Sequence, residues 1–524
     1  MWRRWYANNP ENLLRAAGQE EEHIHLAKKC TWGSRVIDLP SSKWETFIND
    51  RTNRNNLQTF RFESIILPPS PFLNEKLLPM LTNNAKLYSL ELPYCDLGSD
   101  GIAHICSFLE TNTSLCIIDL SSIKIESIED ANRLSMAIKN HKELSLVNLS
   151  GCYVGKGDEG GPDSTVLERI LDGCKTMKSL IIDKNQISKG RDFDAVKSFL
   201  ADNTTITVLS LEDVGFETAH VKKLCQALKK NTSLRHLSLG SNTLSVPSFL
   251  PSRGFNDNLI HLDLSANGIR AQGASVVAEF LSKNHALMEL SLACNKIPSA
   301  AAVVLGKALQ RNSTLEHLDL TFNIFSNKCV PAFADALKHN KTLLSLHLGG
   351  NNIKMAGRVE LVKRAICDTT SLESIADSNH TCQLFLSSGK TLSQNSLTKE
   401  DEMKKINALN SEGQKIRYKV VLALFAINTD LFKPRDFERV PLELMHHLLD
   451  MVQHEVGYKG YGKEILKGTS RKVRKNGFNP TLDRLYAVVM GWNTPLLFAV
   501  RICNTLCHYT SCCCYTHSYH LTLI

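Results

Sequence analysis

Two short pairs of residues carry the side chains that acid–base or metal chemistry requires. His261 stands two residues before Asp263, and His317 stands two residues before Asp319. An imidazole beside a carboxylate can act as a general acid or base, and the same donors can hold a metal ion. Side chains two apart on a strand point the same way, however, and do not converge on a closed pocket. The spacing therefore favours a polar recognition surface over a catalytic or metal site.

Known catalytic and nucleotide-binding motifs are missing from the sequence. There is no Gly-x-x-x-x-Gly-Lys-Ser/Thr phosphate loop, no His-Glu-x-x-His zinc motif and no Gly-x-Ser-x-Gly nucleophile turn. The glycine-rich stretch 155–161 lacks the lysine spacing of a phosphate loop and carries Asp158 and Glu159. We therefore predict a protein that is not an enzyme and that needs no cofactor.

A basic stretch near the C-terminus is the other candidate for ligand chemistry. Its cationic residues recur four apart, so on a helix they would form one stripe suited to nucleic acid or an anionic membrane. Gly460, Gly462 and Gly468 weaken such a helix, and a solvated basic linker is the favoured interpretation. The residues of the stripe are Lys459, Lys463, Lys467, Arg471 and Lys475.

The last 22 residues, 503–524, are rich in cysteine and histidine. They could bind zinc or carry a lipid, but the run Cys512–Cys513–Cys514 does not match the ligand spacing of a structural zinc site. An unselected extension is the alternative, and both stay open. Cysteines elsewhere, such as Cys106 and Cys225, fall among helical positions and predict reduced, packed thiols. We expect a cytoplasmic protein, with a nuclear location as the alternative.

Length and charge bound the remaining choices. The chain has 524 residues, 43% of them hydrophobic, with a net charge of +8. Residues 385–524 hold 19 Lys and Arg against 12 Asp and Glu, so +7 of that charge follows the central region. The N-terminus has no apolar run typical of a signal sequence, and no stretch approaches the ~20 apolar residues of a membrane span. We predict no transmembrane segment.

A repeated phrase organises the central region. Leu259-x-x-Leu262-x-Leu264-x-x-Asn267 returns from residues 287, 315 and 343, and its frame extends back to residue 57. Eleven repeats follow one another in steps of 25 to 33 residues, most often 28. A fixed period of this size indicates a stacked solenoid. The alternation within the phrase predicts a short strand with leucines inward and polar residues outward.

Each repeat also predicts a helix, because apolar residues four apart end six residues before the next strand's first leucine. The asparagine after each strand is expected to hydrogen-bond backbone groups of neighbouring coils. A second asparagine column follows each helix, and we expect it to take the left-handed conformation that ends many helices. The helical pairs include Ile105/Leu109, Val196/Leu200, Leu224/Leu228, Val277/Leu281, Leu305/Leu309 and Phe333/Leu337. The second asparagine column includes Asn112, Asn203, Asn231, Asn284, Asn312 and Asn340.

These phrases resemble the leucine-rich repeat family, and the 28-residue period is similar to its ribonuclease-inhibitor type over residues 57 to 370. The resemblance implies an α/β fold: a leucine-rich repeat solenoid with a curved parallel sheet on the concave side and helices on the convex side. A small helical C-terminal appendage is expected to follow. The same repeat class occurs in activators of a nuclear-transport GTPase, in innate immune receptors and in actin-capping proteins. The resemblance implies a binding scaffold.

The predicted domains follow from these patterns. The loops at 155–162 and 245–254 interrupt two repeats and are candidate contact regions. The closing coil is expected to begin at Leu372, where the frame's first leucine recurs. The domains are an N-terminal cap at 1–56, the solenoid with its closing coil at 57–384, the helical appendage at 385–456, a basic and a short apolar segment at 457–502, and an unstructured tail at 503–524.

The predicted function is a non-enzymatic scaffold that binds a protein partner of unknown identity through the concave face. The alternative is a GTPase-activating protein for a small nuclear-transport GTPase, although such proteins usually carry an acidic tract where this chain turns basic. The concave face is expected to carry mixed charge, which argues against a strongly cationic partner. The predicted partner-binding residues are Arg235, His236, His261, Asp263, Glu289, Glu316, His317, Asp319, Phe322 and His347.

Overall fold

The computed structural model describes residues 59–61, 81, 86–94, 97–125, 127–152, 165–188, 190–247, 257–368, 374, 377–386 and 410. The predicted N-terminal cap, basic segment and tail lie outside these residues, as does the helical appendage at 385–456 apart from Phe385, Leu386 and Asn410. Most of the two irregular loops is also outside them. The chain forms two compact units, one of residues 1–358 with 384–391 and one of residues 359–383 with 392–524.

The strands of the described residues form one sheet in which twelve strands follow the order of the sequence. Each strand from β1 to β11 pairs in parallel with its neighbours in this range. The predicted α/β solenoid is therefore confirmed. The strands are β1 Thr59–Arg61, β2 Ser89–Glu91, β3 Ile117–Asp119, β4 Leu146–Asn148, β5 Ser179–Ile181, β6 Val208–Ser210, β7 His236–Ser238, β8 His261–Asp263, β9 Glu289–Ser291, β10 His317–Asp319, β11 Ser345–His347 and β12 Gln383–Phe385.

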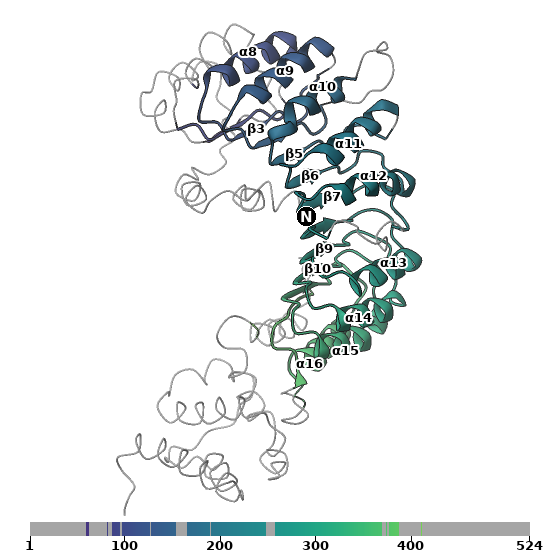
Figure 1. Cartoon of the computed structure of the whole chain (residues 1–524). Coiled ribbons are helices and arrows are strands. Elements are labelled where there is room, and N and C mark those ends of the chain that lie inside the picture. The colour runs from purple at the N-terminus through teal and green to yellow at the C-terminus, as the bar shows by residue number, and fades with distance from the viewer. Residues whose placement is uncertain are drawn as a thin grey trace, which may run out of the picture. The chain divides into compact units, whose positions relative to one another are not determined.

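A helix connects most successive strands, and within the first unit the helices line the side of the coils away from the strands (Figure 1). The apolar pairs predicted for the helices are buried; in α12 both Leu224 and Leu228 are fully covered. Adjacent helices such as α13 and α14 pack on one another. The helices are α8 Gly98–Thr111, α9 Ile128–Asn140, α10 Val166–Gly173, α11 Gly190–Asp202, α12 Thr218–Lys230, α13 Ala271–Leu281, α14 Ala301–Arg311, α15 Val330–His339 and α16 Met355–Ala365, with short 3-10 turns η2 Cys174–Thr176 and η3 Asn327–Cys329.

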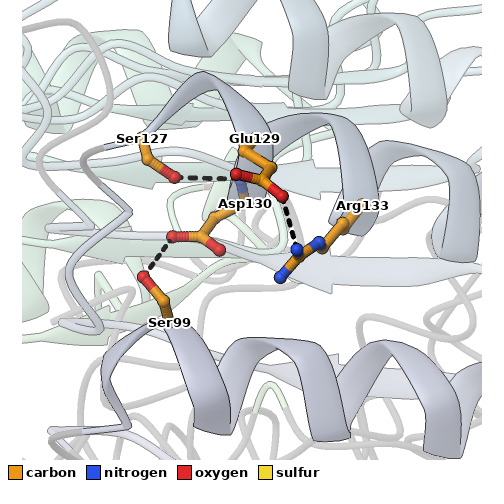
Figure 2. Close-up of polar contacts among 5 residues, drawn as sticks. All are labelled: Ser99, Ser127, Glu129, Asp130 and Arg133. Atoms are coloured by element: carbon orange, nitrogen blue, oxygen red, sulfur yellow. Dashed lines mark hydrogen bonds and ion pairs between the residues drawn. The ribbon is translucent and has the colours of Figure 1, made fainter.

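Polar contacts join the first turns of α8 and α9 (Figure 2). Ser127 caps α9, because its Oγ accepts the backbone N–H of Asp130 at 3.0 Å. The buried carboxylate of Asp130 then accepts the Ser99 hydroxyl from α8 at 2.8 Å. Glu129 and Arg133 form an exposed ion pair one turn apart. The cap thus fixes the start of one helix and ties it to the helix of the preceding coil.

The strand register sets the outward side chains in two rows along the sheet. From β7 to β11, each residue of one strand lies beside its counterpart on the next. We call the surface made by these rows and the turn residues after each strand the strand face. The first row contains His236, His261, Glu289, His317 and Ser345, and the second row contains Ser238, Asp263, Ser291, Asp319 and His347. The in-register pairing of the strands therefore aligns these side chains.

The asparagines after the strands form the predicted hydrogen-bonded ladder. Nδ2 of Asn295 donates to the carbonyl oxygens of Leu264 and Leu292, at 3.0 Å each. Its Oδ1 accepts the backbone N–H groups of Asn267 at 3.0 Å and Ile269 at 2.9 Å. One buried side chain therefore satisfies backbone groups of two successive coils. Similar bonds involve Asn185, Asn242, Asn267, Asn323 and Asn351.

The second asparagine column corrects a prediction. Asn312, after α14, has φ −80° and ψ 129°, which is extended and not left-handed. Its Oδ1 instead accepts the N–H groups of Thr314 and Leu315, while Nδ2 donates to the carbonyl oxygens of Leu281 and Asn284. Asparagine is present for its hydrogen bonds and not for its tolerance of positive φ. Asn112, Asn231 and Asn340 are extended in the same way.

The left-handed residue lies elsewhere, in the turn directly before each ladder asparagine. Cys294 has φ +56° and Phe322 has φ +54°. Only small or turn-favouring residues adopt this conformation without strain, so the large Phe322 side chain is unusual there. The residues at this position are Tyr94, Ser122, Gly151, Lys184, Asp213, Ser241, Ala266, Cys294, Phe322 and Gly350.

The last described coil begins later than predicted. Strand β12 lies at Gln383–Phe385, so Cys382 and not Leu372 takes the place of the first leucine. Asn379 marks this frame, because its Oδ1 accepts the N–H of Cys382 at 2.6 Å, as each helix-end asparagine does for its leucine. The prediction failed because the step from residue 343 to 382 is 39 residues, well outside the period.

The described cysteines carry free thiols, and all are buried except Cys294. This matches the prediction of packed thiols for the described positions. Cys152 replaces the ladder asparagine of its coil, and its Sγ lies 3.0 Å from the carbonyl oxygen of Leu120. Of the helices in the described part of the chain, none combines the length and apolar character needed to cross a membrane.

Candidate partner-binding face

The structure brings most of the predicted binding residues onto the strand face. Arg235 and Glu316 immediately precede β7 and β10, and Phe322 lies in the turn after β10. The guanidinium of Arg235 donates to the carbonyl oxygens of Thr232 and Leu234. The remaining predicted residues lie in the two rows, with His236, His261, Glu289 and His317 in the first and Asp263, Asp319 and His347 in the second.

Three residues of the first row contact one another. The rings of His236 and His261 are stacked with centroids 3.9 Å apart, and Nδ1 of His261 lies 2.7 Å from Oε2 of Glu289. Burial, reinforced by the neighbouring His261 and Arg235, lowers the pKa of His236 to about 3. His236 is therefore neutral near pH 7, and Glu289 pairs with His261 from the next strand.

As expected for residues two apart on one strand, His261 and Asp263 engage different partners. Asp263 is 3% exposed, and its Oδ1 accepts the backbone N–H of Ser265 at 2.7 Å. Burial raises the pKa of this carboxyl above its ordinary value. His261 instead points along its row to Glu289, because side chains in register on adjacent strands lie closer than residues two apart on one strand.

His317 and Asp319 also engage different partners. Nδ1 of His317 lies 2.7 Å from Oγ of Ser345 on β11, while Oδ1 of Asp319 accepts the backbone N–H of Thr321 at 2.8 Å. Ser345 is buried, and among the described residues no carboxylate completes a triad through His317. The described residues also contain no group of three or more His, Cys, Asp or Glu side chains placed to hold a metal ion.

Charged side chains are unevenly distributed along the strand face. The four coils of β8 to β11 present residues 260–266, 288–294, 316–322 and 344–350. These stretches contain Asp263, Glu289, Glu316 and Asp319, and no lysine or arginine. These four stretches also hold His261, His317 and His347, and Asp263 is buried. Arg235, just before β7, places a positive charge beside His236, so the mixed charge expected of the whole face stays a prediction.

Sequence reasoning missed one exposed residue of the strand face. Phe385 of β12 is 42% exposed, and its ring stacks on His347 with centroids 4.2 Å apart and 7° between the ring planes. The helix-end asparagine at position 379 is the signal that could have located this strand, because a first-leucine position follows such asparagines by three residues. Phe322, which was predicted, is 47% exposed.

Comparison with known proteins identifies related repeats. A family model described as "Leucine Rich repeat" matches residues 230–247, 255–278, 311–328 and 339–362. The chain is 32% identical over 248 residues to NACHT, LRR and PYD domains-containing protein 14 of Mus musculus, a match that covers 43% of this chain and 23% of that protein. The chain thus spans less than a quarter of the length of this curated relative.

Solved structures similar to the chain include an internalin from Listeria monocytogenes and the Rad7 and Elc1 complex of yeast. The internalin match has 16% identity and a TM-score of 0.36, and covers 66% of this chain and 86% of that chain. The match to the yeast complex has 15% identity and a TM-score of 0.37, and covers 57% of this chain and 78% of that chain. Likenesses at this level bear on neither partner nor activity.

Proposed function

We propose that this leucine-rich repeat protein is a non-enzymatic interaction scaffold that binds a protein partner through the strand face, the concave side of its solenoid. The family match and the curated relative support a scaffold, since leucine-rich repeats generally bind proteins. The observation that carries the proposal is the fixed array of outward side chains on β7 to β11. These side chains are held in register by parallel pairing, and several contact one another directly.

Rigidity supports this assignment, because a preformed surface loses little conformational entropy on binding. The asparagine ladder fixes the turn after each strand from behind, and the stacked and paired histidines restrict the rotamers of the first row. Binding by many such points needs no moving part. The histidines and acids of the strand face bond to one another, to Ser345 or to backbone N–H groups, and do not converge on a reaction centre.

Two finer statements belong to the same proposal. The regular alternation of one helix per coil, with steps close to 28 residues, supports the ribonuclease-inhibitor-like type of repeat. The alternative of a GTPase-activating protein gains no support from the strand face or from the relatives. We also propose that the protein is cytoplasmic, because its described cysteines are free thiols and all but Cys294 are buried.

The test is a pull-down with the immobilised full-length chain, followed by identification of the retained proteins. The variant His317→Glu with Asp319→Lys reverses the local charge at the centre of the strand face. Lys307→Glu with Arg311→Glu makes an equal number of changes on the exposed side of α14 and serves as the matched control. The α14 control should unfold at the denaturant concentration of the wild type, since exposed substitutions usually change stability by about 0.5 kcal/mol or less. The unfolding curve of the strand-face variant verifies that it folds.

A partner that is retained by the wild type and the α14 control, and lost by the strand-face variant, supports the proposal. Equal retention by all three proteins would place the binding site elsewhere, with the loops at 155–162 and 245–254 as the next candidates. If only the α14 control fails to retain the partner, the binding site lies on the helices.

A further inference from the structure

The first row of the strand face continues in register onto β2 to β6, where its character changes. On β7 to β10 the row is polar and partly exposed. On β2 to β6 it is apolar or small, and none of its members is more than 7% exposed. We call these five residues the covered row: Ser89, Ile117, Leu146, Ser179 and Val208.

Neighbours along the row do not account for this burial. Ile117 and Val208 each have a serine on one side, and both are nevertheless buried. His236 stands between the larger side chains of Val208 and His261 and stays partly exposed. Because the strands pair in the same way throughout, the covered row owes its burial to something that lies over it.

Side chains beside the covered row supply only part of this cover. Cys116, which precedes β3, forms one apolar cluster with Ile117 and Leu146, and Tyr88 packs against it. Parallel strands lie about 4.8 Å apart, so Tyr88 is roughly 19 Å from Val208 on β6 and does not reach it. Burial raises the pKa of the Cys116 thiol to about 11. The covered row therefore requires a further segment on this side of the sheet.

Residues 1–29 are the segment of the chain that fits this requirement. They belong to the same compact unit as β2 to β6, whereas residues 392–524 belong to the other unit. Residues 62–80 connect β1 to β2, where other coils have their helix. The loop 153–164 is glycine-rich and contains only two large apolar residues, Tyr153 and Val154. Neither of these two stretches offers an apolar surface to the covered row.

A charge effect on Cys294 supports the same choice. This thiol lies in the turn after β9, on the strand side of the coils. Burial raises its pKa, the positive charge of the chain's N-terminal amino group lowers it, and Asp319 and Asp263 raise it. Salt screens exposed charges beyond about 10 Å, so a charge with this effect acts from the strand side.

The sequence of residues 1–29 favours a helix with one apolar face. Asn9–Pro10–Glu11 is typical of a helix start. Leu13, Ala17 and Ile24 follow at spacings of four and seven, which places them on one face of that helix. The five strands β2 to β6 span about 19 Å, a distance that a helix of about 13 residues crosses.

The charges of the two surfaces are complementary. Residues 1–17 contain Arg3, Arg4 and Arg15 against Glu11. The coils of β2 to β6 present mainly acids in and around their strands, which favours a cationic segment. In residues 88–94, 116–122, 145–151, 178–184 and 207–213 these acids are Glu91, Asp119, Asp183, Glu212 and Asp213, against Lys178 and Lys184.

We propose that residues 1–29 dock as an amphipathic helix on the covered row. The apolar face with Leu13 and Ile24 packs on Ile117, Leu146 and Val208, and the arginines lie towards the acids beside them. The chain thereby fills the β2 to β6 part of its own sheet and leaves β7 to β11 to a partner. This inference goes beyond the proposed function and does not depend on it.

The first test is a photo-crosslink in the full-length chain. Lys178, which is partly exposed and precedes β5, is replaced by p-benzoylphenylalanine. Irradiation should join position 178 to residues 1–29 of the same chain, and peptide mass spectrometry would identify the joined residues. Leu344 precedes β11 in the same way, so the same replacement there is the matched control and should give no crosslink to residues 1–29.

The second test uses the Cys116 thiol as a reporter of the cover. Leu13→Glu with Ile24→Glu puts two charges on the apolar face of the segment and leaves the solenoid sequence intact. Iodoacetamide should then alkylate Cys116 about tenfold faster or more, because exposure lowers the thiol pKa and admits the reagent. Asn12→Glu with Gln19→Glu adds the same charge on the opposite face and should change the rate by about twofold or less.

Cys174 lies in the core and should stay unalkylated in all three proteins, which would show that the coils remain closed. If it reacts as well, the coils have opened and the crosslink decides. Equal Cys116 rates in the wild type and the Leu13, Ile24 variant, with Cys174 unalkylated, would overturn the inference. So would crosslinks from position 178 to another part of the chain, or a product of twice the chain's mass, which would assign the covered row to a second copy. The pull-down on β7 to β11 is unaffected by either result.

Discussion

The backbone N–H of Asn267 donates to Oδ1 of Asn295 at 3.0 Å. The side chain of one ladder asparagine therefore holds the backbone of the preceding one, 28 residues earlier in the sequence. Leucine has nearly the same size but neither donor nor acceptor. Asn295→Leu should leave buried N–H and carbonyl groups of two coils unsatisfied and cost about 3 kcal/mol of unfolding free energy. The midpoint of urea unfolding measures this cost.

Asn295→Cys is the control for the ladder, because Cys152 already serves in this column with its Sγ 3.0 Å from a carbonyl oxygen of the preceding coil. The cysteine variant should lose less unfolding free energy than the leucine variant, since a thiol can replace one of the lost donors. Equal stability of the leucine variant and the wild type would contradict the ladder's role.

The helix-end asparagines yield a prediction that separates the two explanations for this residue type. If Asn312 were present for a left-handed backbone, Asn312→Gly would be neutral or stabilising. Its backbone is extended and its side chain makes four hydrogen bonds, so glycine should cost about 2 kcal/mol and no less than alanine. Thermal unfolding of both variants gives the comparison, and a glycine variant as stable as the wild type would restore the rejected explanation.

His236 should make the fold sensitive to acid. Its folded-state pKa of about 3 lies below the value of about 6.5 for an unfolded chain, so the unfolded state takes up the proton first. Stability is then lost as the pH falls from about 6.5 towards 3, and by pH 5 the loss from this residue is about 2 kcal/mol. Valine fills the same row on the neighbouring strand at Val208. Between pH 7 and pH 5, the urea midpoint of the His236→Val variant should therefore fall less than that of the wild type. An equal fall in both proteins would show that other groups cause the acid sensitivity.

The described cysteines should differ sharply in reactivity. Cys294 is exposed, whereas Cys152 and Cys174 are fully covered, and burial raises the pKa of each of these two thiols to about 12. Because the thiolate is the reacting form, iodoacetamide at about pH 8 should alkylate Cys294 in the native protein and the other two only after denaturation. Peptide mass spectrometry would measure the alkylation of each cysteine. Native labelling of Cys174 would mean that its coil opens readily.

Much of the fold follows from local patterns in the sequence. The leucines at 259, 262 and 264 recur with a fixed period, and the apolar pairs such as Leu305/Leu309 recur with it, so strand, helix and stacking direction were all predictable. The rows of the strand face followed as well, because in-register parallel stacking places equivalent residues side by side. The ladder asparagines were predictable for the same reason, since each coil presents the same unsatisfied backbone groups.

What the sequence left undetermined depends on contacts between residues distant along the chain. His261 pairs with Glu289 rather than Asp263, and His317 with Ser345 rather than Asp319, because the facing strand lies nearer than the next outward residue of the same strand. The extended backbone of Asn312 and the left-handed backbone of Phe322 were decided by the hydrogen bonds of adjacent coils, which no single-residue preference encodes. Phe385 joined the strand face only through a coil that breaks the period, so its place beside His347 was settled by tertiary packing alone.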